Sequence, residues 1–309
     1  MSFNRIALLV FVAAASMALV AQPSGWPPSP GHVTLRIWPG TAPGEQPNQP
    51  AESNSATEKN VIAGKPIYLL NNVSVPTITL YKPQAHDTGS AVVVFPGGGY
   101  RILAIDLEGT EVCDWLNSVG VACVLLKYRV PDTGPYPKSA AALQDAQRAV
   151  GLVREHAREW GIDPNRVGVL GFSAGGHLAA AISTHFEQRL YPALDDADKL
   201  SCRPDFAVVV YPGYLALAER NFAANADINP TDKTPPTFIV QAEDDPVHVE
   251  NAVVYFMQLK NAKVPAELHV YTQGGHGYGL RRTSLPVTAW PLLVETWLRT
   301  INMLPARSE

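Results

Sequence analysis

The sequence predicts a doubly wound α/β fold, in which a mostly parallel central sheet carries helices on both faces. The first observation behind this prediction is a series of short, continuous apolar runs, which are typical of strands buried on both faces of a parallel sheet. The second is that strand-like and helix-like segments alternate along the chain, as they do in doubly wound sheets. The apolar runs lie at 91–95, 121–126, 167–170, 206–211, 237–240 and 268–271.

The segments between and after these runs have the spacing of helices. Apolar residues at positions 143, 146, 150, 153, 157 and 160 step by three and four, which predicts one helix. Gly161 is expected to end it, because glycine accepts the left-handed conformation found after helix C-termini. A second stripe, between Trp290 and Ile301, predicts a helix near the C-terminus. Two segments that alternate apolar and polar residues, 33–38 and 75–81, predict an antiparallel hairpin at the sheet edge.

The N-terminal residues predict export from the cytoplasm. Arg5 precedes an uncharged apolar run over 6–20, which is shorter than the roughly 20 residues of a membrane-spanning helix. Small residues occur near the end of this run, around Ala18 and Ala21, so we expect a cleavable signal peptide over 1–21, with an uncleaved membrane anchor as the alternative. The expected protein is secreted or periplasmic, with no stable membrane span in its mature form. An extended arm over 22–64, rich in Pro, Gly, Ser and Asn, and one catalytic domain over 65–305 would follow.

Charge and cysteine content exclude several classes of function. The net charge is −4 and Lys and Arg are not clustered, so no nucleic-acid partner is expected. No CxxC motif or His/Cys cluster is present, so no metal is expected. Cys113, Cys123 and Cys202 are an odd number, so at least one stays unpaired within the chain, and which pair forms is left open. Cys123 lies in an apolar run and is expected to be a small buried hydrophobic residue.

The strongest local motif is a candidate nucleophile. Gly171-Phe172-Ser173-Ala174-Gly175 directly follows the strand at 167–170, and a helix is expected over 176–182. Gly-x-Ser-x-Gly between a strand and a helix is the pattern of a nucleophile elbow, where small neighbours permit a sharp turn that exposes the serine hydroxyl. Taken alone, the same motif also fits a glycine-rich turn without chemistry.

A serine hydroxyl needs a base and the base needs a carboxylate. His276 is the best of the eight histidines, because it lies in a flexible Gly-Gly-His-Gly segment just after a strand, whereas His177 is expected to pack behind the elbow. Asp245 follows another strand and is the favoured acid, with Asp244 as the alternate and a turn-forming role open to both. Ser173, Asp245 and His276 occur in the order expected for this fold.

A third glycine-rich segment completes the candidate site. Pro96-Gly97-Gly98-Gly99-Tyr100 follows the strand at 91–95, and glycines let the backbone approach a substrate closely. The N–H groups of Gly98, Gly99 and Ala174 are the predicted donors to the oxyanion of a tetrahedral intermediate. A plain glycine turn is the alternative.

Weaker signals concern the substrate pocket. Tyr100, Tyr211 and Tyr214 each follow a strand and are predicted to form its wall, although half-buried structural tyrosines give the same pattern. Glu108 either lines the pocket or sits where the start of a helix favours an acid. The polar, proline-containing segment 215–236 is expected to form a loop or small cap over the site.

With these motifs assembled, the chain from about residue 75 to 280 resembles the acetyl-esterase and acetylxylan-esterase branch of the α/β-hydrolase family. The resemblance rests on Pro-Gly-Gly-Gly-Tyr, Tyr128-Arg129, Asp163-Pro164-Asn165-Arg166, Gly-Phe-Ser-Ala-Gly-Gly-His, Asp-Asp-Pro-Val and Gly-Gly-His-Gly-Tyr-Gly. It implies an α/β-hydrolase fold and Ser173, Asp245 and His276 as the triad. Pro96 stands where lipase-like relatives carry His before the three glycines, which favours the carbohydrate-esterase side.

The resulting hypothesis is a serine esterase that removes short acyl groups, in particular acetyl, from carbohydrate esters such as acetylated xylan. It needs no cofactor, and its partner is a small-molecule or polysaccharide ester. A broad carboxylesterase or a serine peptidase keeps the same fold, but too few residues precede the first glycine loop for the large propeller domain of such a peptidase. A non-catalytic binding module would have no reason to keep all four parts of the site. The sequence does not give the oligomeric state.

Overall fold

The structure, a computed structural model, describes residues 26, 30–45 and 48–306. The predicted signal peptide over 1–21 and the first residues of the predicted arm therefore lie outside the described residues. Among the residues described, no helix is both long enough and apolar enough to cross a bilayer.

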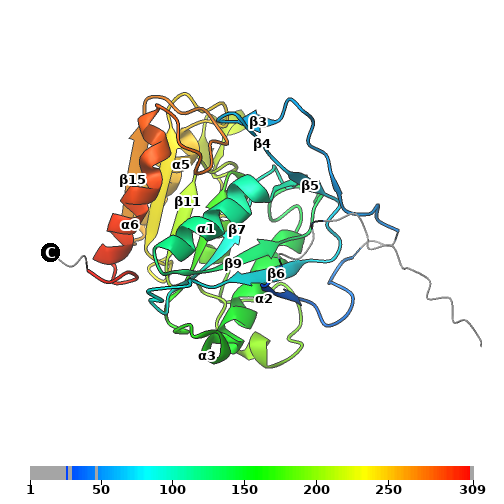
Figure 1. The fold of residues 1–309 in the computed structure, drawn as a ribbon. Coiled ribbons are helices and arrows are strands. Elements are labelled where there is room, and N and C mark those ends of the chain that lie inside the picture. The colour runs from blue at the N-terminus through cyan, green and yellow to red at the C-terminus, as the bar shows by residue number, and fades with distance from the viewer. Residues whose placement is uncertain (1–25, 27–29, 46–47, 307–309) are drawn as a thin grey trace, which may run out of the picture.

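An eight-stranded sheet forms the centre of the molecule (Figure 1). From β9 to β15 every neighbouring pair of strands is parallel, whereas β1 and β6 add antiparallel pairs at one edge. The fold class is therefore the predicted one. In spatial order the strands are β1 (Val33–Arg36), β6 (Thr77–Tyr81), β9 (Ala122–Lys127), β7 (Ala91–Phe95), β10 (Val167–Phe172), β11 (Ala207–Val210), β14 (Thr237–Ala242) and β15 (Ala266–Tyr271).

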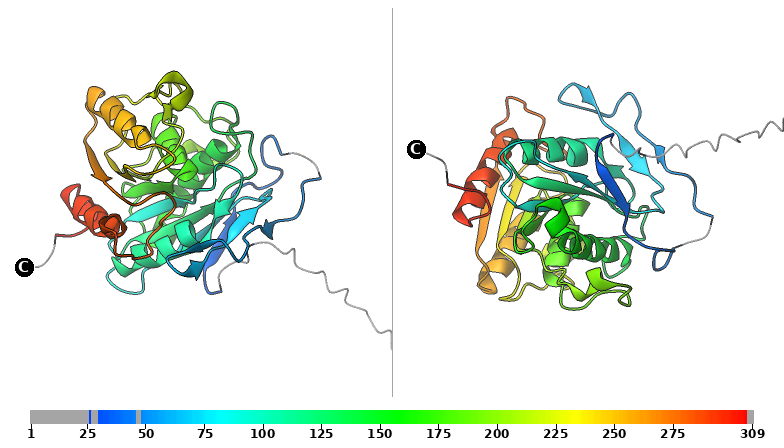
Figure 2. Two further views of the ribbon diagram at one scale, coloured as in Figure 1. Left: turned by 90° about the horizontal axis from the view of Figure 1, so that it is seen from above. Right: turned by 60° about the horizontal axis from the view of Figure 1, so that its bottom comes forward.

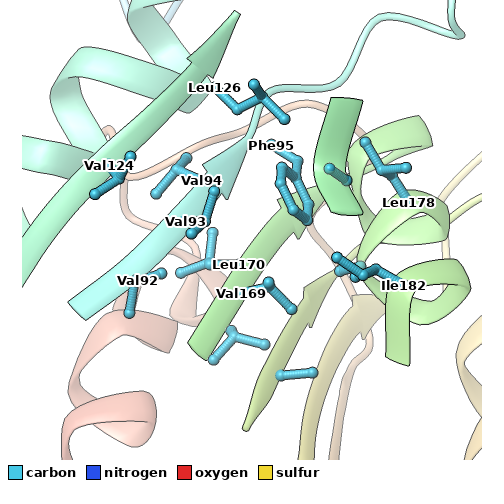
Figure 3. Packing of buried hydrophobic residues seen from close by; sticks show 14 of the residues in the cluster. Val92, Val93, Val94, Phe95, Val124, Leu126, Val169, Leu170, Leu178 and Ile182 are labelled. Carbon is cyan, nitrogen blue, oxygen red and sulfur yellow. The ribbon is translucent and has the colours of Figure 1, made fainter. Parts of the chain in front are cut away.

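Burial on both faces explains the apolar runs. Every residue of β7, β10, β11 and β14 is buried. Figure 3 shows Val93 and Val94 of β7 and Val169 and Leu170 of β10 packed within the core, together with Leu178 of the helix that follows the elbow. The six predicted runs are all strands, with bounds that differ by at most two residues.

Helices cover both faces of the sheet (Figures 1 and 2). On one face lie α1 (Glu111–Ser118) and α6 (Trp290–Thr300), joined by an edge-to-face contact between Trp115 and Trp290. On the other lie α2 (Ala141–Glu155), α4 (Ala174–Thr184) and α5 (Glu250–Asn261). Four further helical segments of the described chain are short: the π-helix η1 (Asp106–Thr110) and the 3₁₀ helices η2 (Asp196–Lys199), η3 (Ala218–Arg220) and η4 (Pro286–Ala289).

One predicted helix is two helices in the structure. The stripe over 143–160 divides at His156 into α2 and α3 (Ala157–Trp160). His156 leaves the helical conformation, with ψ of 2°, and its ring stacks on Trp160. The apolar stripe keeps its spacing across this single residue, so the sequence did not show the break. Gly161 ends α3 with a φ of 73°, as predicted.

The predicted edge hairpin is an antiparallel pair without a tight turn. β1 pairs with β6, with Val33 opposite Leu80. The residues between them contribute β2 (Ser53–Asn54) and β5 (Leu69–Asn71) to a small sheet that is completed by β8 (Leu103–Ala104) from later in the chain. They also form a second small sheet of β3 (Val61–Ile62) and β4 (Lys65–Pro66). Because β8 follows the glycine segment 97–99, this part of the chain packs beside the candidate site.

A disulfide joins Cys113 of α1 to Cys123 of β9, and Cys202 is a buried free thiol. This settles the pairing that the sequence left open. It also corrects the expectation that Cys123 is only a small hydrophobic residue, since its sulfur is covalently bonded within the core. The two cysteines are ten positions apart in the sequence and come together because α1 packs directly on β9.

Candidate active site

The candidate residues gather at one edge of the sheet because parallel strands end there together. Segments that follow β7, β10, β14 and β15 carry the glycines, Ser173, Asp245 and His276 respectively. Ligand sites of open α/β sheets lie at this carboxyl edge.

Ser173 occupies a sharp turn between β10 and α4. Its φ of 53° and ψ of −115° are unusual for a residue with a side chain and cost of the order of 1–3 kcal/mol. The turn also explains the flanking glycines. A Cβ at position 171 would lie 1.9 Å from the carbonyl oxygen of Gly175, and one at position 175 would lie 2.1 Å from that of Phe95. Only glycine fits either position.

His276 lies within hydrogen-bond distance of both Ser173 and Asp245. His276 Nε2 is 2.8 Å from Ser173 Oγ, and its Nδ1 is 2.9 Å from Asp245 Oδ2. Asp245 is buried and also accepts hydrogen bonds from the Val247 N–H and the Gln241 side chain, at 2.7 and 3.0 Å. These donors hold the carboxylate in position, and the carboxylate orients the imidazole.

The alternate acid, Asp244, has a different set of partners. Its Oδ1 accepts the N–H groups of Gly274 and Gly275, at 2.9 and 2.8 Å. It therefore holds the backbone of the segment that carries His276 and has no hydrogen bond to the imidazole itself.

The glycine segment is a tight loop whose carbonyl groups are turned away for internal bonding. Gly97 O accepts from Ala104 N–H and Gly98 O from Ile102 N–H. Gly98 and Gly99 have φ of 138° and 63°, and a Cβ on Gly97 would come within 2.9 Å of Ser173 Cβ. Within the described chain, the N–H groups of Gly98 and Gly99 have no acceptor. Ala174 begins α4, where a helix leaves the N–H without an internal partner. These three amides stay the predicted oxyanion donors.

The structure corrects the predicted substrate wall. Tyr214 is 39% exposed and lines a cavity beside Ser173, so its binding role stays a prediction. Tyr100 is buried, with its hydroxyl 2.8 Å from His177 Nδ1. Tyr211 is also buried, and its ring lies edge-to-face 4.9 Å from that of His276. Each of these two side chains points into the protein and bonds to a polar partner, His177 for Tyr100 and Glu108 for Tyr211. A position directly after a strand does not show whether a tyrosine points inward or towards the cavity.

Glu108 is buried beneath the glycine segment, within η1. Its Oε2 accepts the Gly97 N–H at 2.7 Å, and its Oε1 accepts the Tyr211 hydroxyl at 2.7 Å. Burial raises the pKa of Glu108, and these two hydrogen bonds oppose that rise. Of the two roles that the sequence left open for Glu108, the position in a helical turn agrees with the structure. The sequence did not indicate its two hydrogen bonds.

A cavity of about 760 Å³ opens above Ser173. The segment 215–236, expected to be a loop or small cap, contains a two-stranded ribbon of β12 (Ala216–Leu217) and β13 (Ala223–Ala224) and forms part of the cavity wall through residues 216–220 and 225–227. Residues 135–138 also line the cavity. The remaining wall is contributed by Gly99, Gly213, Tyr214, Val247, His248 and Asn251. In the part of the chain that the structure describes, no three His, Cys, Asp or Glu side chains are grouped to hold a metal ion.

His177 is a buried imidazole, and burial lowers its pKa to about 3, with a smaller effect from His185. A charged imidazole needs an acceptor at each nitrogen, and Nε2 has no partner among the described residues. The neutral form therefore fits the site.

This burial predicts loss of stability in acid. As the pH falls from 6.5 towards 3, the unfolded chain gains a proton on His177 and the folded protein does not. Stability present above pH 6.5 is therefore lost over this range. We expect the free energy of unfolding of the wild type to fall, relative to His177→Asn, by roughly 1 kcal/mol per pH unit between pH 6 and 4. Urea titrations across this range measure the difference, and a difference independent of pH would contradict a neutral buried His177.

Comparison with known proteins places the chain in a family. The family described as alpha/beta hydrolase fold matches residues 92–280, which include all the residues assembled above. The chain is a member of this family, and the resemblance drawn from the motifs is confirmed.

Several individual proteins of known name or structure are similar to this chain. An acetylxylan esterase of Xylanibacter ruminicola is 33% identical over 217 residues, which cover 62% of this chain and 42% of that protein. Endo-1,4-beta-xylanase B of Butyrivibrio fibrisolvens is 29% identical, over 66% of this chain and 34% of its own. The chain thus spans less than half the length of these two relatives. The crystal structure of an acetyl ester-xyloside bifunctional hydrolase from Caldicellulosiruptor lactoaceticus is 34% identical, with a TM-score of 0.69, over 88% of this chain and 97% of that one.

Proposed function

We propose that the protein is a serine ester hydrolase that removes short acyl groups, in particular acetyl, from carbohydrate esters such as acetylated xylan. The observation that carries this proposal is the relay of Ser173, His276 and Asp245, with donor–acceptor distances of 2.8 and 2.9 Å. This arrangement activates a hydroxyl for attack on a carbonyl carbon.

In the proposed reaction Ser173 Oγ attacks the ester carbonyl while His276 Nε2 takes its proton. Asp245 accepts a hydrogen bond from Nδ1–H, which fixes the tautomer and stabilises the imidazolium. His276 then protonates the leaving alcohol, and an acyl-enzyme on Ser173 remains. The same imidazole next activates a water molecule, which releases the acid and restores the hydroxyl.

The oxyanion is proposed to be held by the N–H groups of Gly98, Gly99 and Ala174. Their freedom from internal hydrogen bonds supports this role, because such donors must be available to a developing charge without rearrangement. The carbonyl oxygens of Gly97 and Gly98 also support this role, because they accept hydrogen bonds within the loop. A carbonyl oxygen that pointed at the oxyanion would repel its negative charge.

The choice of a carbohydrate ester rests on the relatives and on the cavity. Two of the similar proteins carry acetyl-ester activity in their names. The cavity wall combines the aromatic rings of Tyr136 and Tyr214 with polar side chains such as Asn225 and Asp227. Aromatic faces and hydrogen-bonding groups together suit a sugar, which has both apolar faces and hydroxyls.

Export, with a signal peptide over 1–21 and a secreted or periplasmic mature protein, is part of the same proposal. The disulfide between Cys113 and Cys123 supports it, because disulfides persist in oxidising compartments.

Acetate release from acetylated xylan tests the proposed substrate. We expect the wild type to release acetate from this polymer and to hydrolyse 4-nitrophenyl acetate faster than the octanoate. De-acetylated xylan, which offers glycosidic bonds but no ester, is the matched control and should yield nothing. Rapid turnover of small esters without acetate release from the polymer would contradict the carbohydrate assignment and favour a broad carboxylesterase.

A further inference from the structure

A buried carboxylate connects two loops of the candidate site that come from opposite ends of the domain sequence. Glu108 lies beneath the glycine segment and is 4% exposed. Its Oε2 accepts the N–H of Gly97, where an added Cβ would lie 2.9 Å from the Ser173 Cβ. This hydrogen bond turns the Gly97 amide away from the cavity and leaves the next two amides, of Gly98 and Gly99, as the free ones.

The second oxygen of Glu108 reaches the segment that carries His276. Oε1 accepts the hydroxyl of Tyr211 at 2.7 Å, and the same hydroxyl oxygen accepts the N–H of Gly279 at 3.1 Å. The Tyr211 ring also lies edge-to-face against the His276 imidazole. One side chain is therefore coupled to the backbone on both sides of the space in which an ester would react.

We propose that Glu108 is a positioning residue that holds the glycine loop and the histidine loop in a single reactive arrangement. The inference rests on the proposed function, because it assigns a role within that reaction. Both partners of the carboxylate are donors, so both of its oxygens must accept. Only the ionised carboxylate does this fully, and its negative charge also lies near the imidazolium that forms on His276.

Glu108→Gln is the test, because glutamine keeps the shape and loses one acceptor. The amide oxygen can accept from Gly97 or from Tyr211, and its NH₂ group then faces the other donor. We expect kcat on 4-nitrophenyl acetate to fall about 10- to 100-fold, the range that a small displacement of catalytic groups causes. KM should stay within about threefold, because Glu108 lies outside the cavity wall. Binding of a phenylboronic acid, which forms a tetrahedral adduct on the serine, should weaken by the same factor as kcat/KM.

Tyr211→Phe keeps the ring in the core and removes only the link between Glu108 and Gly279. Its loss should be smaller than that of Glu108→Gln. If both residues act through one connection, the double variant should be no slower than Glu108→Gln alone. Losses that multiply in the double variant would overturn the inference. If Glu108→Gln does not fold, Tyr211→Phe alone decides the matter, and a kcat for this variant within twofold of the wild type would overturn the inference.

Asp205→Asn is the matched control. Asp205 likewise bridges a backbone N–H, that of Val167, and a side chain, that of Arg154, but at the opposite end of β10. Its kcat should stay within twofold of the wild type. A kcat for folded Glu108→Gln within twofold of the wild type would overturn the inference.

Hydrogen exchange separates this inference from the proposed function. If the wild type hydrolyses no ester and Ser173 is not labelled by a fluorophosphonate, the proposed function is wrong. The positioning role is then decided by amide exchange alone. Faster exchange in both 96–104 and 272–281 of Glu108→Gln, with no change in Asp205→Asn, supports it. Unchanged exchange in these segments overturns it.

Discussion

Ser173→Ala is expected to lower kcat by roughly 10⁵- to 10⁶-fold. The substitution removes the hydroxyl that lies 2.8 Å from His276 Nε2, so neither proton transfer from Ser173 nor acyl-enzyme formation remains. Substrate binding should persist, because the cavity wall and the glycine loop are unchanged. The residual rate would come from the predicted oxyanion donors and from the orientation of the bound substrate.

Measurement requires purified variant, acetate release and labelling with a fluorophosphonate probe. Ser183→Ala is the matched control, since Ser183 lies on the same helix α4 and its hydroxyl donates to the carbonyl oxygen of Ala179 within that helix. It should keep wild-type turnover and labelling. Retention of more than a tenth of the activity by Ser173→Ala would refute the proposed nucleophile.

Asp245→Asn is expected to lower kcat about 10⁴-fold. Asparagine fits the same space, but its NH₂ group can donate to Nδ1 and so stabilise the tautomer in which Nε2 carries the proton. In that tautomer Nε2 cannot accept the proton of Ser173. The imidazolium would also lose the adjacent negative charge.

Asp244→Asn provides the comparison that separates the two neighbouring acids. The asparagine oxygen can still accept the N–H groups of Gly274 and Gly275, so the loss should stay below about tenfold. Steady-state kinetics of both variants on one ester decide the question. A larger loss in Asp244→Asn than in Asp245→Asn would transfer the role of the acid to Asp244.

The sequence predicted the features that depend on repeating chemical patterns. The parallel strands follow from runs such as 91–95 because burial on both faces demands continuous apolar residues. The place of Ser173, Asp245 and His276 at one edge follows from strand ends, where each motif begins. The structure adds that the three side chains lie within hydrogen-bond distance, and their catalytic roles stay a proposal.

The sequence did not predict features set by side-chain direction or by contacts between distant segments. Tyr100 and Tyr211 stand after strands, as Tyr214 does, but they turn inward to His177 and Glu108. The residues next to each tyrosine do not show whether its side chain points inward or towards the cavity, because that direction depends on a partner far away in the sequence. The Cys113–Cys123 bond likewise depends on how α1 packs against β9.

The residues covered by the family match are not sufficient by themselves to hold the candidate site in place. Residues 92–280 omit Trp290, whose Nε1 donates to the Gly279 carbonyl at 2.9 Å. They also omit β5, which pairs with β8, and Tyr68, whose N–H donates to Asp106 at the start of η1. Anyone grafting this site into another enzyme, or fusing it to a sugar-binding module, must therefore carry the segments on both flanks. In this chain the scaffold that aligns the reactive groups extends beyond the residues that the family match covers.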